Sequence, residues 1–350
     1  MATDYFEVST LCLLFIAASA ESKLAIAGIK RHGIVVLPPG AHGRIDDVSH
    51  SRWLSRGRVA HVEPRTEILH SVLGMLEEPA PVGGLAALRF WGQTGERSAS
   101  WIAAADPIHL ETRLHSLRVR SLRPDELPIS DLRLLFDNLQ ATLGGDSGLA
   151  FARLGQFGYL RGSSPIDTAP MSASVLHGLP PDDFIPSGDS AVGHHQLLGE
   201  VQMVLHDHDV NMKRAETALP SINSLWIWGG GIAPEPVKRT LPLLFANDPL
   251  FRGYWNSCMG VVEDWPVDIE SALSASSSAF VAVMPEFAPD VSAPALTDCL
   301  GQLRRSLVRG RVGSLSLLFR DGLSVDISRW DALRFWRGIS SLLEKTSDDD

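Results

Sequence analysis

The chain has 350 residues, of which 45% are hydrophobic and 21% charged, so it has the composition of a globular protein with room for one large or two ordinary domains. Its formal net charge of −10 argues against a nucleic-acid-binding protein, because phosphate contacts require clustered lysine and arginine. The densest basic run, residues 303–311, is interpreted as a solvated helix face and the loop after it. The three cysteines are scattered, which favours a reducing compartment over a disulfide framework, and we therefore expect a cytoplasmic protein.

An apolar run near the N-terminus, residues 11–20, has the composition of the hydrophobic part of a secretion signal. The residues before it include Asp4 and Glu7 and no lysine or arginine, which is the wrong charge for such a signal. The run is also too short to span a bilayer. We interpret it as a buried helix or extended start, with a cleaved signal as the alternative, and expect neither a transmembrane segment elsewhere nor a membrane partner.

The rest of the chain alternates between short apolar runs and amphipathic segments, which is typical of α/β proteins. Strands are expected at 33–37, 101–105, 151–160 as a broken pair, 224–228 and 279–284, with a hairpin of 313–320 and 323–327 turning at Asp321-Gly322. Helices are expected at 46–57, 67–76, 130–143, 197–205 and 330–343. The runs 34–37, 224–228 and 279–284 are predicted to lie in one mostly parallel sheet with helices on both faces.

The most distinctive stretch is residues 194–234. An amphipathic helix ends there in the polar residues 206–209, and the aromatic run 224–228 that follows is typical of a strand. Gly229-Gly230-Gly231 at the end of that strand would let the backbone approach a ligand or another chain closely. His206 and His208 are spaced so that on a helix they point apart, and a polar helix end is the alternative to a metal site there.

Residues 206–214 and 220–234 together resemble a block of the archaeal-type cofactor-independent phosphoglycerate mutases, which belong to the alkaline phosphatase superfamily. In that block a helix ends in His-Pro-Val-Asn-x-x-Arg and leads to a strand reading Asn-x-x-Trp-x-Trp-Gly-x-Gly. The chain is still more similar to a bacterial group called regulation of pathogenicity factors type E, which is described as phosphoglycerate-mutase-like. Residues 105–110, Ala-Asp-Pro-Ile-His-Leu, resemble a second hallmark of that group.

The resemblance implies an alkaline-phosphatase-like three-layer α/β fold with a mostly parallel central sheet and an inserted, smaller α+β domain. The corresponding division of the chain is 1–104 and 216–350 for the two parts of the core and 105–215 for the inserted domain.

The resembled enzymes hold two divalent metal ions with Asp and His ligands, and a serine between the metals carries the phosphoryl group. At the place of the first carboxylate this chain has Pro39-Gly40, and the residue nearest to the serine is Thr66. Thr66 is a weak candidate for a nucleophile, and a helix N-cap followed by Glu67 is the alternative. Of the later ligand pattern only Asp290 remains, so we expect no metal and no other cofactor.

What remains of the resemblance is a set of residues that in the enzymes faces the carboxylate and hydroxyl groups of the substrate. These candidate ligand-binding residues are Asp106, His109, Asn211, Arg214, Asn223 and Trp228. Arg214 would clamp the carboxylate or phosphate of a small metabolite. Alternatively the asparagines satisfy backbone groups at turns, the tryptophans are packed core, and Arg214 is tied to an internal carboxylate.

Three functions remain open. The favoured one is a catalytically degenerate phosphoglycerate-mutase-like protein with a regulatory or ligand-sensing role, whose ligand is a phosphorylated or carboxylated metabolite. The alternatives are an active cofactor-independent phosphoglycerate mutase or phosphoesterase, and a structural partner protein without a small-molecule site.

Overall fold

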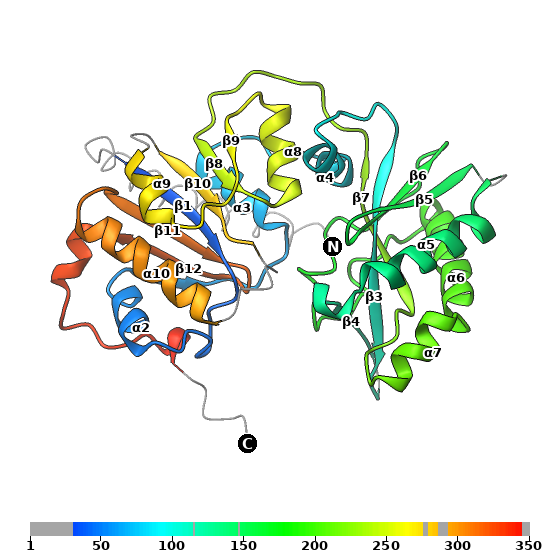
Figure 1. Cartoon of the computed structure of the whole chain (residues 1–350), viewed down its shortest axis with the longest axis horizontal. Helices are drawn as coiled ribbons and strands as arrows, with labels where there is room; N and C mark the ends of the chain where they lie inside the picture. Colours follow the sequence, from blue (N-terminus) through cyan, green and yellow to red (C-terminus); the bar gives the residue numbers. More distant parts are fainter. Residues whose placement is uncertain (1–30, 115, 146–147, 276–278, 286–292, 345–350) are drawn as a thin grey trace, which may run out of the picture.

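The structure, a computed structural model, describes residues 31–344 except 115, 146–147, 276–278 and 286–292. Two β-sheets lie in two lobes that stand side by side (Figure 1). The predicted N-terminal segment at residues 11–20 lies outside the described residues. Among the helices of the described part, none is long and apolar enough to cross a membrane.

The first sheet has seven strands in the order β2-β12-β11-β1-β10-β8-β9. These are β1 (His32–Leu37), β2 (Arg58–His61), β8 (Leu243–Ala246), β9 (Val262–Glu263), β10 (Phe280–Val283), β11 (Ser314–Phe319) and β12 (Leu323–Ser328). The five strands from β11 to β9 are parallel to their neighbours, and β12 and β2 are antiparallel at one edge. The predicted mostly parallel central sheet of a mixed α/β protein is therefore confirmed, as is the hairpin at Asp321-Gly322.

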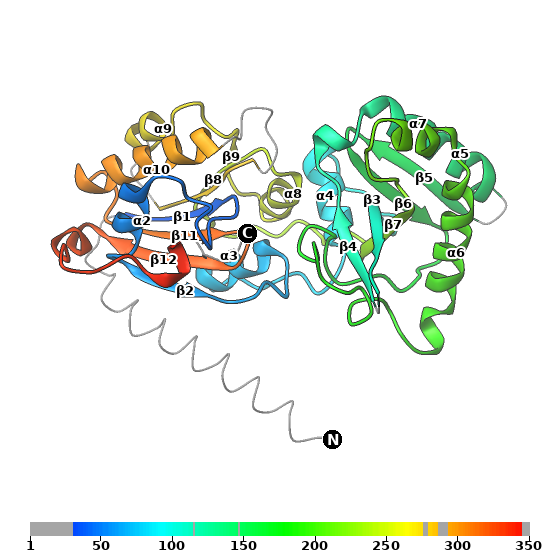
Figure 2. The same cartoon turned by 90° about the horizontal axis from the view of Figure 1, so that it is seen from below.

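Helices cover both faces of this sheet, which explains why its central strands are apolar on both sides (Figures 1 and 2). Along β1, Ile34 and Val36 belong to one core cluster, and Val35 and Leu37 belong to another on the opposite face. The first face is covered by α3 (Ile68–Leu76), α4 (Leu85–Thr94) and α8 (Pro249–Ser257). The second is covered by α2 (Val48–Leu54), α9 (Ile269–Ala275) and α10 (Ala293–Val308).

The second sheet is antiparallel and follows the order β4-β3-β6-β5, with β7 on the free side of β3. Its strands are β3 (Ile102–Thr112), β4 (Leu117–Ser121), β5 (Leu149–Leu154), β6 (Phe157–Gly162) and β7 (Ser224–Gly231). The helices α5 (Ile129–Leu143), α6 (Val192–His206) and α7 (Asp209–Glu216) lie on the side away from the first lobe (Figures 1 and 2).

The prediction that residues 224–228 belong to the parallel sheet is wrong, because β7 pairs antiparallel with β3, with Trp226 opposite Asp106. Leu225 and Ile227 pack under α5 and α6, whereas Trp226 and Trp228 belong to the core beneath α4. A strand buried on both faces has a continuous apolar sequence in either kind of sheet, so the pattern could not distinguish them.

In chain order the second sheet lies between β2 and β8 of the first, as an insertion requires. The boundaries at 104/105 and 215/216 stay a proposal. The sheet itself begins at Ile102 and ends at Gly231.

The helix predicted at 330–343 is also wrong. That segment contains two short 3₁₀ helices, η4 (Arg329–Leu333) and η5 (Ser341–Leu343), separated by irregular chain. Contacts with the α2–β2 turn hold it in this form: Arg337 donates to the carbonyl of Gly57 at 2.5 Å, and the Ser340 amide donates to the Ser55 hydroxyl at 2.9 Å.

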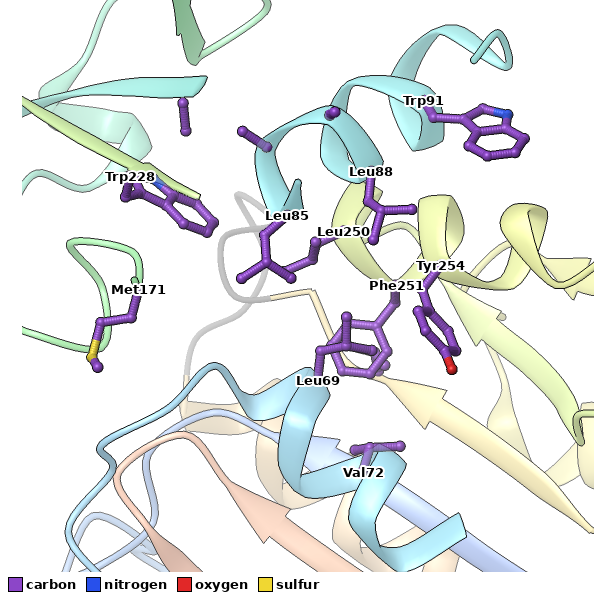
Figure 3. Packing of buried hydrophobic residues seen from close by; sticks show 14 of the residues in the cluster. Leu69, Val72, Leu85, Leu88, Trp91, Met171, Trp228, Leu250, Phe251 and Tyr254 are labelled. Carbon is purple, nitrogen blue, oxygen red and sulfur yellow. The ribbon is translucent and has the colours of Figure 1, made fainter. Parts of the chain in front are cut away.

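Helices α4 and α8 cross at an unusually short distance. A Cβ atom added to Gly253 would lie 1.8 Å from the carbonyl oxygen of Leu88, and one added to Gly92 would lie 1.9 Å from that of Pro249. Both glycines are therefore required by backbone contact between the two helices. The neighbouring side chains Leu88, Phe251 and Tyr254 fill the space around the crossing (Figure 3).

We predict that Gly253→Ala lowers the free energy of unfolding by about 3 kcal/mol, because the new methyl group forces the helices apart. Gly199→Ala in α6 is the matched control, since a Cβ there meets nothing within 4 Å. The control should be neutral or stabilising by up to about 1 kcal/mol. Urea unfolding of both variants measures the difference, and equal stabilities would contradict the importance of the crossing.

Candidate functional site

The carboxyl ends of the parallel strands meet at one edge of the first sheet, where ligands bind in α/β proteins. Three arginines follow these strand ends: Arg44 after β1, Arg252 in α8 after β8, and Arg320 directly after β11. We call Arg44, Arg252 and Arg320 the edge arginines. Sequence reasoning missed them because they are far apart along the chain and only the strand order brings them to one edge.

At Pro39-Gly40, directly after β1, the backbone binds a carboxylate from elsewhere in the chain. The amides of Gly40 and Ala41 donate to Oδ2 of Asp321 at 2.8 and 2.7 Å. Nη1 of Arg44 lies 3.6 Å from the same oxygen. Asp321 is thus neutralised by two backbone N–H groups and a nearby cation.

Asp248 connects the end of β8 to the end of β11. Its Oδ1 caps α8 by accepting from the amides of Leu250 and Phe251 at 2.9 and 3.2 Å. Its Oδ2 lies 3.4 Å from Nη2 of Arg320, whose side chain is 14% exposed. One helical turn further, Arg252 donates to the carbonyl of Ala246 at 3.1 Å, which fixes it at the end of β8.

Glu67 is a buried carboxyl group beside this pair. It occupies the N-cap position of α3, is 6% exposed, and accepts a 2.5 Å hydrogen bond from the amide of Ser172. Loss of water raises its pKa, and the charge of Asp248 raises it further, whereas the hydrogen bond from Ser172 and the charge of Arg320 lower it. Glu67 thereby joins α3 of the first lobe to the long connection between β6 and α6.

Thr66 is exposed in the turn before α3, and its interpretation as the N-cap is wrong, because Glu67 takes that position. In the described part of the chain, no three His, Cys, Asp or Glu side chains are grouped to hold a metal ion. The carboxylates at the edge accept hydrogen bonds from backbone amides or pair with arginines instead. The described side chains therefore do not fit a two-metal centre. Asp290 lies outside the described residues.

Two of the predicted ligand-binding residues fasten β3 to the chain before β7. The side-chain amide of Asn223 accepts from the amide of Leu110 at 2.7 Å and donates to its carbonyl at 3.0 Å, which extends the ladder by one rung. His109 contacts the carbonyl of Ser221 through Nδ1 at 2.9 Å. These contacts agree with the alternative that the residues satisfy backbone groups.

Asn211 and Arg214, in the first and last turns of α7, act similarly. Asn211 donates to the carbonyls of Leu205 and Ile222 and accepts from the amide of Ile222, with distances of 2.7, 2.9 and 2.8 Å. Arg214 is 2% exposed and donates to the carbonyls of Glu126 and Pro220 at 2.6 and 2.8 Å. Its Nη1 also lies 3.7 Å from the Asp131 carboxylate. The geometry therefore favours the internal, structural alternative for both residues.

Asp106 and Trp228 belong to a buried cluster around Arg89, which sequence reasoning also missed. Arg89 donates to both carboxylate oxygens of Asp106 at 2.7 and 2.9 Å, and Trp228 Nε1 donates to Oδ2 at 2.7 Å. The ring of Tyr159 lies 4.8 Å from the guanidinium carbon, and burial raises the pKa of its hydroxyl to about 12. The only local signal for this cluster was an arginine in the otherwise apolar start of the helix at residues 85–91.

The three glycines that follow Trp228 approach another segment of the same chain, rather than the ligand or second chain that the sequence suggested. A Cβ on Gly231 would lie 2.5 Å from the amide nitrogen of Gly84, and one on Gly230 would lie 2.7 Å from the Trp101 ring. The amide of Gly84 also donates to the carbonyl of Gly230 at 3.2 Å.

The histidines at 206 and 208 occupy a helix junction. His208 caps α7 by accepting from the amide of Val210 at 3.1 Å, and the side chain of His206 is 83% exposed. Their positions agree with the polar helix end that was the alternative to a metal site.

Comparison with known proteins points to one group of enzymes at low identity. No family model matches the sequence. The 2,3-bisphosphoglycerate-independent phosphoglycerate mutase of Methanosarcina acetivorans is 25% identical over 140 residues, which cover 38% of this chain and 34% of that protein. The same enzyme of Methanosarcina barkeri is 25% identical over 123 residues, covering 34% and 30%. The chain thus matches about a third of the length of these relatives, to which it is weakly homologous.

Two solved structures are similar over most of the chain. The cofactor-independent phosphoglycerate mutase of Thermoplasma acidophilum has a TM-score of 0.38 and 17% identity, and the match covers 86% of this chain and 90% of that one. A protein of Pyrococcus horikoshii has a TM-score of 0.46 and 12% identity, with 85% and 88% covered.

We predict that Arg214→Ala lowers the free energy of unfolding of the ligand-free protein by about 3 kcal/mol, because one buried and one partly buried carbonyl group lose their donor. Lys213→Ala, at the exposed neighbouring position, is the control and should change stability by less than about 0.5 kcal/mol. Denaturant unfolding compares the two. A melting temperature unchanged by Arg214→Ala would restore the ligand-binding interpretation of this residue.

We predict that Glu67→Gln stabilises the protein increasingly as the pH rises. The raised pKa means that folded Glu67 keeps its proton above the unfolded value of about 4.3, so the wild type loses stability between that pH and the raised pKa. The amide oxygen of glutamine still accepts from Ser172. The difference in unfolding free energy between variant and wild type should therefore be larger at about pH 8 than at about pH 5.

Glu63→Gln is the matched control for this experiment, because the side chain of Glu63 is 57% exposed in the same segment. Its effect should be small and nearly constant with pH. A pH-independent effect of Glu67→Gln would show that the carboxyl group ionises as easily in the folded as in the unfolded protein.

Proposed function

We propose that the protein is a catalytically degenerate, phosphoglycerate-mutase-like protein that senses a small phosphorylated or carboxylated metabolite at the carboxyl edge of its first sheet. The observation that carries this proposal is the position of Arg320, at the end of the parallel strand next to β1 and 3.4 Å from Asp248. Arginine binds carboxylate and phosphate groups in bidentate fashion without a metal ion. The candidate ligand site is thus the set of edge arginines rather than Arg214 and its neighbours.

The edge arginines differ in how strongly the protein neutralises them. Arg252 faces Asp264 at 2.5 Å, but that carboxylate is 80% exposed, so solvent screens their attraction. Arg44 is 60% exposed. An anion arriving at the edge would share Arg320 with Asp248 and recruit the other two arginines.

The buried carboxyl group of Glu67 supplies a way to transmit such binding. A negative ligand beside Arg320 would raise the pKa of Glu67 further, so that Glu67 is more often protonated. A protonated carboxyl group accepts a weaker hydrogen bond from the Ser172 amide than a carboxylate does. Ser172 follows Met171, whose carbonyl accepts from Trp226 Nε1 at 2.8 Å in the second sheet (Figure 3 shows the side chain of Met171). Ligand binding at the first sheet is therefore coupled to the second, as a regulatory role requires.

The same proposal includes two finer assignments. We place the chain with the regulation of pathogenicity factors type E proteins because of its runs 105–110, 206–214 and 220–234. We also propose a cytoplasmic location, on the scattered cysteines, of which Cys258 and Cys299 are free and buried.

We predict that 3-phosphoglycerate raises the melting temperature of the wild type in a saturable way, because a ligand specific for the folded state stabilises it by mass action. Arg320→Gln should weaken this binding at least about tenfold, since it removes a charge-assisted hydrogen bond. Arg133→Gln in α5 is the matched control, as that side chain is 71% exposed and lies in the other lobe. The same shift in wild type and Arg320→Gln would contradict the proposed site.

The two alternative functions give different outcomes in the same preparation. An active mutase would contain tightly held divalent metal and interconvert 3- and 2-phosphoglycerate with added Mn²⁺. A structural partner protein would show neither turnover nor a shift with any phosphorylated or carboxylated three-carbon acid. The proposed sensor shows the shift without turnover.

A further inference from the structure

Three arginines at the end of α10 converge on one carboxylate. Nε of Arg305 and Nη1 of Arg311 lie 3.0 and 2.9 Å from the oxygens of Glu270, and Nη1 of Arg309 contacts the same group. The Glu270 side chain is 12% exposed, whereas those of the arginines are 37–55% exposed. Asp268, two residues before Glu270, lies near Arg305 as well. The three arginines thus outnumber the two carboxylates, and each arginine is more exposed than Glu270.

A fourth arginine extends this group. Nη1 of Arg329 lies 3.3 Å from the position of a Cβ on Gly310, in the turn that follows α10. The amide of Arg329 donates to the carbonyl of Gly313 at 3.3 Å. Its guanidinium carbon also lies 5.5 Å from the ring centre of Trp330. The arginines at the end of α10 are thus continuous with the segment that begins at Arg329.

That segment exposes four large apolar side chains. Trp330, Leu333, Phe335 and Trp336 are exposed by 67, 62, 76 and 71%. The segment is nevertheless anchored, by the bonds to the α2–β2 turn and by Asp331, which accepts from the amide and hydroxyl of the residue before Arg329 at 2.7 Å each. Such a group of exposed apolar side chains marks an interaction surface.

Although the sequence led us to expect no membrane partner, we infer that this face binds the surface of a membrane that contains anionic lipids. We call it the basic–aromatic face and define it by Arg305, Arg309, Arg311, Arg329, Trp330, Leu333, Phe335 and Trp336. The arginines match the negative head groups, and tryptophan and phenylalanine rings suit the boundary between head groups and acyl chains. The total charge of −10 does not prevent this contact, because repulsion from distant carboxylates is screened beyond about 10 Å.

The connection to the N-terminal residues lies on the same face. Arg31, the first described residue, donates to the carbonyl of Arg311 at 2.9 Å, and its own carbonyl accepts from Gly313. Residues 11–20 are apolar in sequence, and ten residues separate them from Arg31. Stable attachment to a membrane surface commonly needs two weak signals together, and this face holds the basic one beside Arg31, the residue that follows the N-terminal segment in sequence. This observation favours a lipid surface over an acidic protein.

The test uses the full-length protein and vesicles of phosphatidylcholine with or without about a third of phosphatidylglycerol, measured by flotation and by tryptophan fluorescence. We expect binding only to the anionic vesicles, loss of binding in high salt, and a blue shift of the emission. The double variant Arg309→Gln/Arg311→Gln should weaken the partitioning about tenfold or more. The double variant Trp330→Ser/Trp336→Ser should remove the blue shift and weaken binding.

Arg113→Gln/Arg133→Gln is the matched control, because both of these arginines are exposed and ion-paired in the other lobe. It should bind the vesicles like the wild type. Equal binding of all variants would assign any membrane contact to residues 1–30 and overturn the proposal. Binding to polyglutamate without binding to anionic vesicles would assign the face to an acidic protein partner and overturn it as well. Melting temperatures of the variants show that each is folded.

Discussion

The contact between α4 and its two neighbours holds the lobes together. On one side α4 meets α8 through Gly92 and Gly253 at backbone distance, and on the other it inserts Arg89 into the second sheet. A buried arginine is stable only if its hydrogen bonds are complete, and Asp106, Gly158 and Tyr159 supply acceptors for this one. One short helix thus fixes the position of each sheet relative to the other.

The carboxyl edge of the first sheet depends on that fixed arrangement, because Glu67 of one lobe and Ser172 of the other meet there. The acidic side chains of the edge cap a helix, bind backbone amides or pair with arginine. Their oxygens thus already have partners within the protein. Divalent metal ions would need those oxygens unoccupied and convergent. The proposed recognition of an anion by the edge arginines needs no such metal ligands.

Much of the first sheet could be predicted from the sequence, because its strands are short apolar runs ended by glycine or proline and its hairpin has a distinctive turn. The sheet to which β7 belongs could not be predicted, since burial on both faces erases the alternation that marks an antiparallel strand. The helix predicted at 330–343 failed for another reason. Its apolar residues have helical spacing, but arginine contacts to a distant turn hold the backbone in another form.

The candidate site was less predictable than the fold. The residues around Asn211 and Arg214 form a recognisable run, but their side chains serve the turn itself. Glu67, Asp248 and Arg320 are separated by more than seventy residues at each step and form no motif. Only the order of the parallel strands brings them together, and that order is a long-range property of the chain.

The place where the chain enters and leaves the second sheet also affects how the protein folds. Arg97, just before β3, donates to the carbonyl of Ala233, just after β7, at 3.0 Å. The two ends of the segment between Arg97 and Ala233 are therefore close together once β3 and β7 have paired. Once this inserted segment is folded, it acts as a short connection between the strands of the first sheet. The entropic cost of closing a loop grows with its effective length, so a short connection costs less. Early pairing of β3 with β7 thus lowers the entropic cost of bringing β8 beside the strands that precede it in the chain.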